Sequence, residues 1–126
     1  MRALTTALLL ALLGGCSEPQ PTLTGGKPAG HWVEQLSANP DAKVRKEAAF
    51  KLGNVGPADP AALPALTAAL KDRDAAVRRE AVLALVKFGP SARPVVPALV
   101  DLRDRDRDPK VRGYAAKAVE KLQASE

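Results

Sequence analysis

The stretch Asp41-Ala42-Lys43-Val44-Arg45 recurs as Asp74-Ala75-Ala76-Val77-Arg78 and again as Asp108-Pro109-Lys110-Val111-Arg112. The offsets between the copies are 33 and 34 residues. A constant offset of this size indicates an array of stacked units, in which each unit buries its apolar side chains against its neighbours. Such arrays usually bind other proteins, so the repeat predicts the architecture closely and the function only broadly.

Each copy begins with a helix. Its apolar residues recur at the helical spacing i, i+4, i+8 and i+11 in two copies: Val44, Ala48, Leu52 and Val55, then Val77, Ala81, Leu85 and Phe88. The aspartate before each helix is suited to cap it, because a carboxylate accepts from the free amides of the first turn. Gly56-Pro57 and Gly89-Pro90 are typical of helix ends.

A second, shorter helix follows in each unit, with apolar positions at Leu63, Leu66, Leu70 and at Val96, Leu99, Leu102. Pro64 and Pro97 fall near the start of these helices. Proline is poorly tolerated in a helix interior, so we expect each helix to begin two or three residues earlier or to bend there. No segment alternates with the period of a strand, and the sequence predicts no β-structure.

The repeated pattern Asp-x-x-Val-Arg-x-x-Ala-x-x-x-Leu, followed by Gly-Pro and Pro-Ala-Leu, resembles the HEAT-repeat family over about residues 31–123. The similarity is greatest to the short variety found in phycobilisome lyases. The resemblance implies an all-α fold, a short α-solenoid of about three helix pairs (31–57, 58–90 and 91–123) in a right-handed superhelix. It also implies a structural ladder between repeats, formed by Asp41, Arg45, Asp74, Arg78, Asp108 and Arg112.

The N-terminus has the pattern of an export signal. Met1-Arg2 precedes a short apolar run, and Leu13-Gly14-Gly15-Cys16 resembles the bacterial lipobox. The run is shorter than the roughly 20 residues that a transmembrane helix needs. We therefore expect residues 1–15 to be a lipoprotein signal peptide and Cys16 to be lipidated, which would anchor the protein to a membrane of the bacterial cell envelope on its periplasmic or outer-membrane side. The alternative is a free cysteine at the end of an ordinary signal.

Residues 16–30 contain few apolar side chains and predict a flexible tether, which leaves residues 31–126 as the folded domain. Cys16 is the only cysteine, so a disulfide within the chain is excluded. His31-Trp32-Val33-Glu34-Gln35-Leu36 is expected to form a helix that caps the first repeat. Trp32 is expected to pack in the core, although a ligand-stacking role stays open.

No pattern indicates a catalytic or metal site. His31 has no neighbouring nucleophile or ligand set. Asp104, Asp106 and Asp108 alternate like calcium ligands, but the glycine and glutamate that an EF-hand loop requires are missing and arginines separate the acids. Glu47 and Glu80 have no sign of an apolar pocket that would raise a carboxyl pKa. We expect no enzymatic activity and no cofactor.

The arc opposite the apolar stripe is the candidate binding surface, because the resemblance implies that these helices line the concave side of the superhelix. The chain carries a net charge of +5, and this arc is mostly cationic with two apolar positions. Its candidate residues are Lys46, Phe50, Arg79, Leu83, Lys87, Lys117 and Lys121. Helical angle also places Gly53, Val86 and Glu120 on this arc. An apolar centre with a charged rim is typical of protein-binding surfaces. The alternative is that Phe50 and Leu83 pack between repeats.

These features together predict a membrane-anchored scaffold or adaptor that binds another protein through its concave helices, with an acidic segment as the candidate ligand. Two alternatives are weighed against it. The first is a bilin lyase-like or other accessory enzyme subunit, which the export signal and the missing catalytic set disfavour. The second is a nucleic-acid binder, which the export signal and the scarcity of aromatic residues disfavour.

Overall fold

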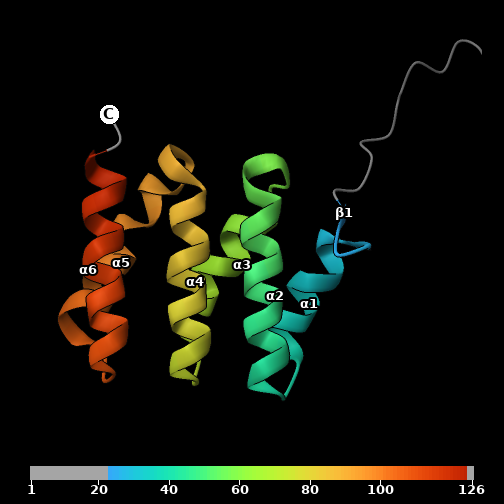
Figure 1. The fold of residues 1–126 in the computed structure, drawn as a ribbon, viewed down its shortest axis with the longest axis horizontal. Coiled ribbons are helices and arrows are strands. Elements are labelled where there is room, and N and C mark those ends of the chain that lie inside the picture. The colour runs from blue at the N-terminus through green and yellow to red at the C-terminus, as the bar shows by residue number, and fades with distance from the viewer. Residues whose placement is uncertain (1–22, 125–126) are drawn as a thin grey trace, which may run out of the picture.

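The computed structural model describes residues 23–124, and these fold into a two-layered stack of helices. One layer contains α2 (Ala42–Val55), α4 (Ala75–Lys87) and α6 (Pro109–Ala124), which run side by side in Figure 1. Behind it lie α1 (Ala29–Ala38), α3 (Ala62–Ala69) and α5 (Val96–Arg105). Successive helices pair as α1–α2, α3–α4 and α5–α6, as expected for three helix-pair repeats. The predicted all-α fold is confirmed.

The helices start and end where the sequence predicts. The carboxylates of Asp41, Asp74 and Asp108 each accept from amides of the following turn, at N–O distances of 2.7–3.1 Å. Gly56 and Gly89 follow α2 and α4 with φ of 63° and 56°, a conformation that other residues rarely adopt. Each opens a short 3₁₀ segment, η2 (Gly56–Ala58) and η3 (Gly89–Val95). The N-caps predicted from the sequence are confirmed.

The prolines of the shorter helices lie in their first turns. Pro64 is the third residue of α3 and Pro97 is the second residue of α5. The missing amide hydrogen costs little there, since the first-turn amides have no partner within the helix. This explains why the α1–α3–α5 layer can contain prolines without kinked helices.

The core lies between the two layers. The apolar positions Val77, Ala81, Leu85 and Phe88 are all buried, as are Ala48 and Leu52. Val44 and Val55, at the ends of the first stripe, are half-buried. Within the α2–α4–α6 layer, α2 and α4 approach each other closely. A Cβ atom on Gly53 of α2 would lie only 2.8 Å from the Cβ atom of Ala84 in α4, so glycine permits this contact.

A small β-hairpin precedes the first helix and corrects the prediction that the chain has no β-structure. Strand β1 (Leu23–Thr24) pairs antiparallel with β2 (Lys27–Pro28). Gly25 and Gly26 form the two-residue turn with φ of 58° and 73°, as hairpin turns of this length require. A flexible tether was predicted for residues 16–30, and α1 begins at Ala29. The tether prediction is therefore wrong for residues 23–30.

Trp32 holds the hairpin to the stack. Its indole Nε1 donates a 2.9 Å hydrogen bond to the carbonyl oxygen of Thr24. The side chain is only 7% exposed, and its ring lies 5.9 Å from the Lys51 ammonium of α2. The predicted core role of Trp32 is confirmed. The hairpin persists in a polar segment because this hydrogen bond and the buried indole supply contacts that its own four strand residues lack.

No helix among the described residues has the length and apolar character needed to cross a membrane.

Candidate protein-binding face and the ladder beneath it

A buried arginine of α2 connects the first repeat to the second. Arg45 is 4% exposed, and its Nε and Nη2 atoms donate to the two carboxylate oxygens of Asp72 at 2.9 and 3.0 Å. Its Nη1 atom donates to the carbonyl oxygens of Asn39 and Pro40, both at 3.0 Å. The guanidinium is therefore fixed by its own repeat on one edge and by the next repeat on the other.

The same arrangement recurs one repeat later. Arg78, 6% exposed, donates from Nε and Nη2 to Asp106 at 2.9 and 3.0 Å, and from Nη1 to the carbonyl oxygen of Asp72 at 2.8 Å. Asp72 and Asp106 also accept from the backbone amides of Asp74 and Asp108. Bidentate pairs of this kind combine charge with fixed geometry. We call the Arg45–Asp72 and Arg78–Asp106 pairs the inter-repeat ladder.

The structure corrects the acidic members of the predicted ladder. Asp41, Asp74 and Asp108 cap helices, and the carboxylates that meet the arginines belong to Asp72 and Asp106, two residues before a cap. Both types of aspartate occur in the Asp-x-Asp turn between helices. The prediction gave the capping role and the pairing role to the same aspartate, whereas in the structure one aspartate caps the helix and another pairs with the arginine.

Burial and pairing act in opposite directions on the Asp72 carboxyl. Burial alone would raise its pKa, but the hydrogen bonds from Arg45 and from the Asp74 amide together hold the pKa below its usual value of 3.8. The same hydrogen bond, made to Asp72, raises the pKa of the Arg45 guanidinium. Both groups therefore stay charged over the physiological pH range.

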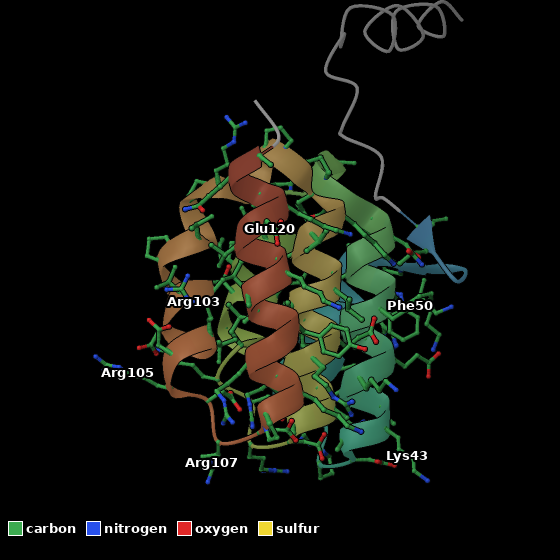
Figure 2. All side chains as sticks on the ribbon, turned by 60° about the vertical axis from the view of Figure 1, so that its left-hand side comes forward. Lys43, Phe50, Arg103, Arg105, Arg107 and Glu120 are labelled. Carbon is green, nitrogen blue, oxygen red and sulfur yellow. The ribbon has the colours of Figure 1, made fainter. Side chains whose placement is uncertain are left out.

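The side of α2, α4 and α6 that is turned away from α1, α3 and α5 forms an exposed surface, here called the binding face. Three large apolar side chains are exposed on it, one from each helix: Phe50 at 44%, Leu83 at 40% and Tyr114 at 39%. Figure 2 shows Phe50 projecting from α2 on this side, away from α5 and its arginines Arg103 and Arg105. The alternative, that Phe50 and Leu83 pack between repeats, is not what the structure shows.

Basic residues surround these three side chains. Seven exposed or half-exposed cationic residues occur on the binding face, against two acidic ones, Glu47 and Glu80. The cationic residues are Lys43, Lys46, Arg79, Lys87, Lys110, Lys117 and Lys121. The repeat offset places Phe50 and Leu83 at equivalent positions of α2 and α4, with Lys117 at the same position of α6. The face thus combines three exposed apolar side chains with surrounding cationic side chains.

A shallow hollow of about 130 Å³ crosses the middle of the binding face. Lys46 of α2, Arg79, Glu80 and Leu83 of α4, and Tyr114 of α6 line it together with Ala76. The Nε atom of Arg79 is buried and has no hydrogen-bond partner. The hollow is thus bordered by two cationic side chains, Lys46 and Arg79, and one acidic side chain, Glu80.

Lys87 is already engaged by its neighbours. Its ammonium lies 4.5 Å from the centroid of the Phe50 ring and donates a 3.0 Å hydrogen bond to the Asn54 side chain. These contacts connect α4 to α2 across the face. They fix the position of the Phe50 ring and leave Lys46, Arg79 and Lys117 as the cations nearer the centre of the face.

One position of the predicted arc belongs elsewhere. Gly53, Val86 and Glu120 occupy equivalent places in α2, α4 and α6, and Gly53 is buried against Ala84 of the next helix. This position therefore points toward the following repeat and not toward the binding face. Figure 2 shows Glu120 on the side of α6 that is turned away from α2 and α4.

Tyr114 is the residue of the face that the sequence did not predict. Its equivalents in the first two copies are Glu47 and Glu80, so the repeat pattern indicated a polar position there. A large aromatic at a variable, solvent-facing position was the available signal. Its 39% exposure and its place in the hollow make it a candidate contact residue.

The structure places several other residues that the sequence singled out. No cluster of potential metal ligands occurs among residues 23–124. The His31 ring lies edge-on to Trp32 with centroids 4.9 Å apart. Asp106 belongs to the ladder, Asp108 caps α6, and Asp104 pairs with Arg103 on the surface. Cys16 and the predicted signal peptide lie outside the described residues.

A comparison with known families identifies the fold. The sequence model of the HEAT repeats matches residues 30–121, almost all of the folded region. The chain belongs to the HEAT-repeat family. HEAT repeats generally mediate protein–protein interaction and typically serve as non-enzymatic scaffolds. The comparison with curated proteins found no match.

Proposed function

We propose that this HEAT-repeat protein is an adaptor that binds an acidic, extended segment of another protein across its binding face. The observation that carries the proposal is the row of Phe50, Leu83 and Tyr114, exposed on three successive helices and surrounded by cations. Monomeric proteins rarely gather large apolar side chains on one surface without a binding role.

The packing of the layers supports this choice of surface. Neighbouring helices of the α2–α4–α6 layer pack closely, whereas α3 and α5 make little contact with each other. A stack curves toward the layer with the closer spacing, which favours the binding face as the inner side. A segment lying there would cross all three helices and meet each of the three apolar side chains in turn.

The charges favour an acidic segment. Lys46 and Arg79 border the hollow, and both side chains are cationic. A carboxylate of the segment placed there would receive a charge-assisted hydrogen bond. Apolar side chains on either side of that carboxylate would contact Leu83 and Tyr114.

The test is a selection of random peptides on the immobilised chain. We expect the selected peptides to be enriched in aspartate and glutamate next to large apolar residues. A triple variant, Lys46→Glu, Arg79→Glu and Lys117→Glu, should bind such a peptide at least about tenfold more weakly, because like charges then face each other.

The matched control reverses three cations on the other layer: Lys71→Glu, Arg103→Glu and Arg105→Glu. It changes the net charge equally and should bind the peptide with unchanged affinity. Equal losses in both variants would show that only net charge matters, and selected peptides without acidic residues would contradict the proposal.

We also propose that a lipid on Cys16 holds this adaptor at the bacterial cell envelope. The lipobox-like sequence Leu13-Gly14-Gly15-Cys16 supports this. Intact mass and membrane fractionation of the chain expressed in bacteria, beside Cys16→Ala, test it. We expect the wild type to lose residues 1–15, gain acyl mass and sediment with membranes, whereas Cys16→Ala does none of these. A soluble, unacylated wild type would overturn the anchor.

A further inference from the structure

The side of α6 that faces away from α4 carries Arg112, Ala116 and Glu120 at successive turns. Residues four apart lie on one side of a helix. The equivalent residues of α2 are Arg45, Ala49 and Gly53, of which Arg45 pairs with Asp72 of the next repeat and Gly53 lies against Ala84 of the next helix. This side of α6 is therefore the one on which α2 and α4 contact the following repeat.

Arg112 is half of a ladder pair. Like Arg45 and Arg78, it donates from Nη1 to a carbonyl oxygen six residues earlier, that of Asp106 at 2.7 Å, with a longer contact of 3.4 Å to Arg107. The first two arginines direct Nε and Nη2 to a carboxylate. Within residues 23–124 no carboxylate meets these two atoms of Arg112. The Nε and Nη2 atoms of Arg112 are therefore oriented to donate to a carboxylate that residues 23–124 do not supply.

Glu120 opposes coverage by another repeat of the same kind. Its equivalents are the buried Gly53 and the half-buried Val86, and both contribute to the apolar junction between repeats. Packing a further apolar helix there would bury the Glu120 carboxylate without a partner, which is costly. This surface needs a cation opposite Glu120 and an anion opposite Arg112.

A head-to-tail copy does not satisfy Arg112. The N-terminal residue equivalent to Asp72 and Asp106 is Asn39, an uncharged amide with a single acceptor oxygen, Oδ1, which already accepts from the Asp41 amide at 2.9 Å. A second α6, run antiparallel to the first, presents the required charges. About a two-fold axis at Ala116, position 112 of one helix faces position 120 of the other, four residues on either side of the centre.

We propose that two copies of this chain associate through α6, with Arg112 of each copy paired to Glu120 of the other and the two Ala116 residues in contact at the axis. Such an interface is isologous, so each ion pair is formed twice. Ala116 and Gly113 have little or no side chain, which permits close approach of the two helices. The association is separate from the binding face and does not depend on the proposed partner.

The experiment is sedimentation velocity of the purified full chain over a concentration series, with a reducing agent so that Cys16 cannot cross-link copies. The interface offers charge complementarity but none of the large exposed apolar residues of the described chain. We therefore expect a weak dimer, with a dissociation constant on the order of 100 µM. Arg112→Glu and Glu120→Arg should each weaken it at least about tenfold, since each sets like charges against each other twice.

A mixture of the two variants and a double variant make the test specific to the two-fold geometry. An equal mixture of Arg112→Glu and Glu120→Arg should form a heterodimer, because the first supplies two acids and the second two arginines. The double variant should self-associate again. Arg105→Glu, an exposed reversal on α5, is the control and should dimerise like the wild type.

A wild type that stays monomeric at about 1 mM would overturn the proposal. A dimer that neither single reversal weakens would also overturn it, as would a double variant and mixture that stay monomeric. If Arg112→Glu unfolds because its carbonyl contacts are lost, Glu120→Arg alone still decides, since Glu120 is exposed. Circular dichroism of each variant establishes that it is folded.

Discussion

Arg78 and Arg79 are adjacent in α4, yet they belong to different parts of the molecule. Arg78 is buried, forms a bidentate pair with Asp106 and recurs in every copy as Arg45 and Arg112. Arg79 lines the hollow of the binding face, has an unpaired Nε, and has Lys46 and Gly113 as its equivalents. The difference teaches that, of these two neighbouring positions, the one kept identical among the copies holds the stack together, whereas the one that varies lies on the proposed binding surface.

Replacing these two arginines separately should give the largest contrast. We expect Arg78→Ala to lower the free energy of unfolding by about 3–5 kcal/mol, because it leaves the Asp106 carboxylate buried without its partner. Arg79→Ala should change it by less than about 0.5 kcal/mol, as is usual for surface positions. Urea unfolding followed by circular dichroism measures both.

Arg105→Ala is the control for the ion pair itself. Arg105 pairs with Asp101 at 3.5 Å, and the two side chains are 81% and 64% exposed. Such pairs contribute about 0–1 kcal/mol. A loss in Arg105→Ala equal to that in Arg78→Ala would contradict the claim that burial gives the ladder its importance.

Two glycines test the same contrast by their packing. Gly53→Ala should destabilise by about 1–3 kcal/mol, because the added Cβ atom would lie 2.8 Å from the Cβ atom of Ala84. Gly113, in α6, has no atom within 4 Å of where its Cβ atom would lie. Gly113→Ala should therefore stabilise by about 0.5–1 kcal/mol through helix propensity. Thermal unfolding distinguishes the opposite signs, and shifts of the same sign would show that the α2–α4 contact is not tight.

Acid should weaken the inter-repeat ladder through Asp72. The folded pKa of Asp72 lies below 3.8, its value without these partners. Its contribution to stability is therefore fully present above that value and is lost as pH falls through 3.8 and then through the lower folded pKa. Stability measured from pH 6 to pH 2 should fall less steeply in Asp72→Asn. An identical pH dependence in both proteins would exclude Asp72 as a source of acid sensitivity.

A small effect on stability is also expected at Leu83. Leu83→Ser removes an apolar side chain that is already 40% exposed, so the free energy of unfolding should change by less than about 1 kcal/mol. The same change should weaken binding of a selected acidic peptide by several fold, because Leu83 lies at the centre of the face. Isothermal titration beside urea unfolding separates the two quantities, and a large loss of stability would place Leu83 in the core.

The sequence predicted the helices well because their signals are local and repeated. Capping aspartates, apolar stripes and terminal Gly-Pro pairs all acted within one helix, and three copies supported each other. The ladder acids were wrong because Asp72 and Asp74 are the same residue type two positions apart. Only the three-dimensional path of the turn decides which carboxylate reaches the arginine of the preceding repeat.

The surface was harder to predict than the core. Helical angle alone placed Gly53 and Glu120 on the binding arc, because it does not show how wide the contact with the next helix is. Tyr114 was missed since its equivalents are glutamates. The hairpin was missed because its strands have two residues each, and their stability depends on a hydrogen bond from Trp32, a residue outside the hairpin.

The most direct test of the account compares Arg79→Glu with Arg103→Glu, a charge reversal of equal size on the α5 side. Affinity for a selected acidic peptide and the free energy of unfolding are measured for both. We predict that Arg79→Glu binds at least about tenfold more weakly and that Arg103→Glu binds like the wild type, with both proteins close to wild type in stability. Equal affinities in the two variants, or a loss of binding that follows a loss of stability, would contradict the assignment of this face as the site of function.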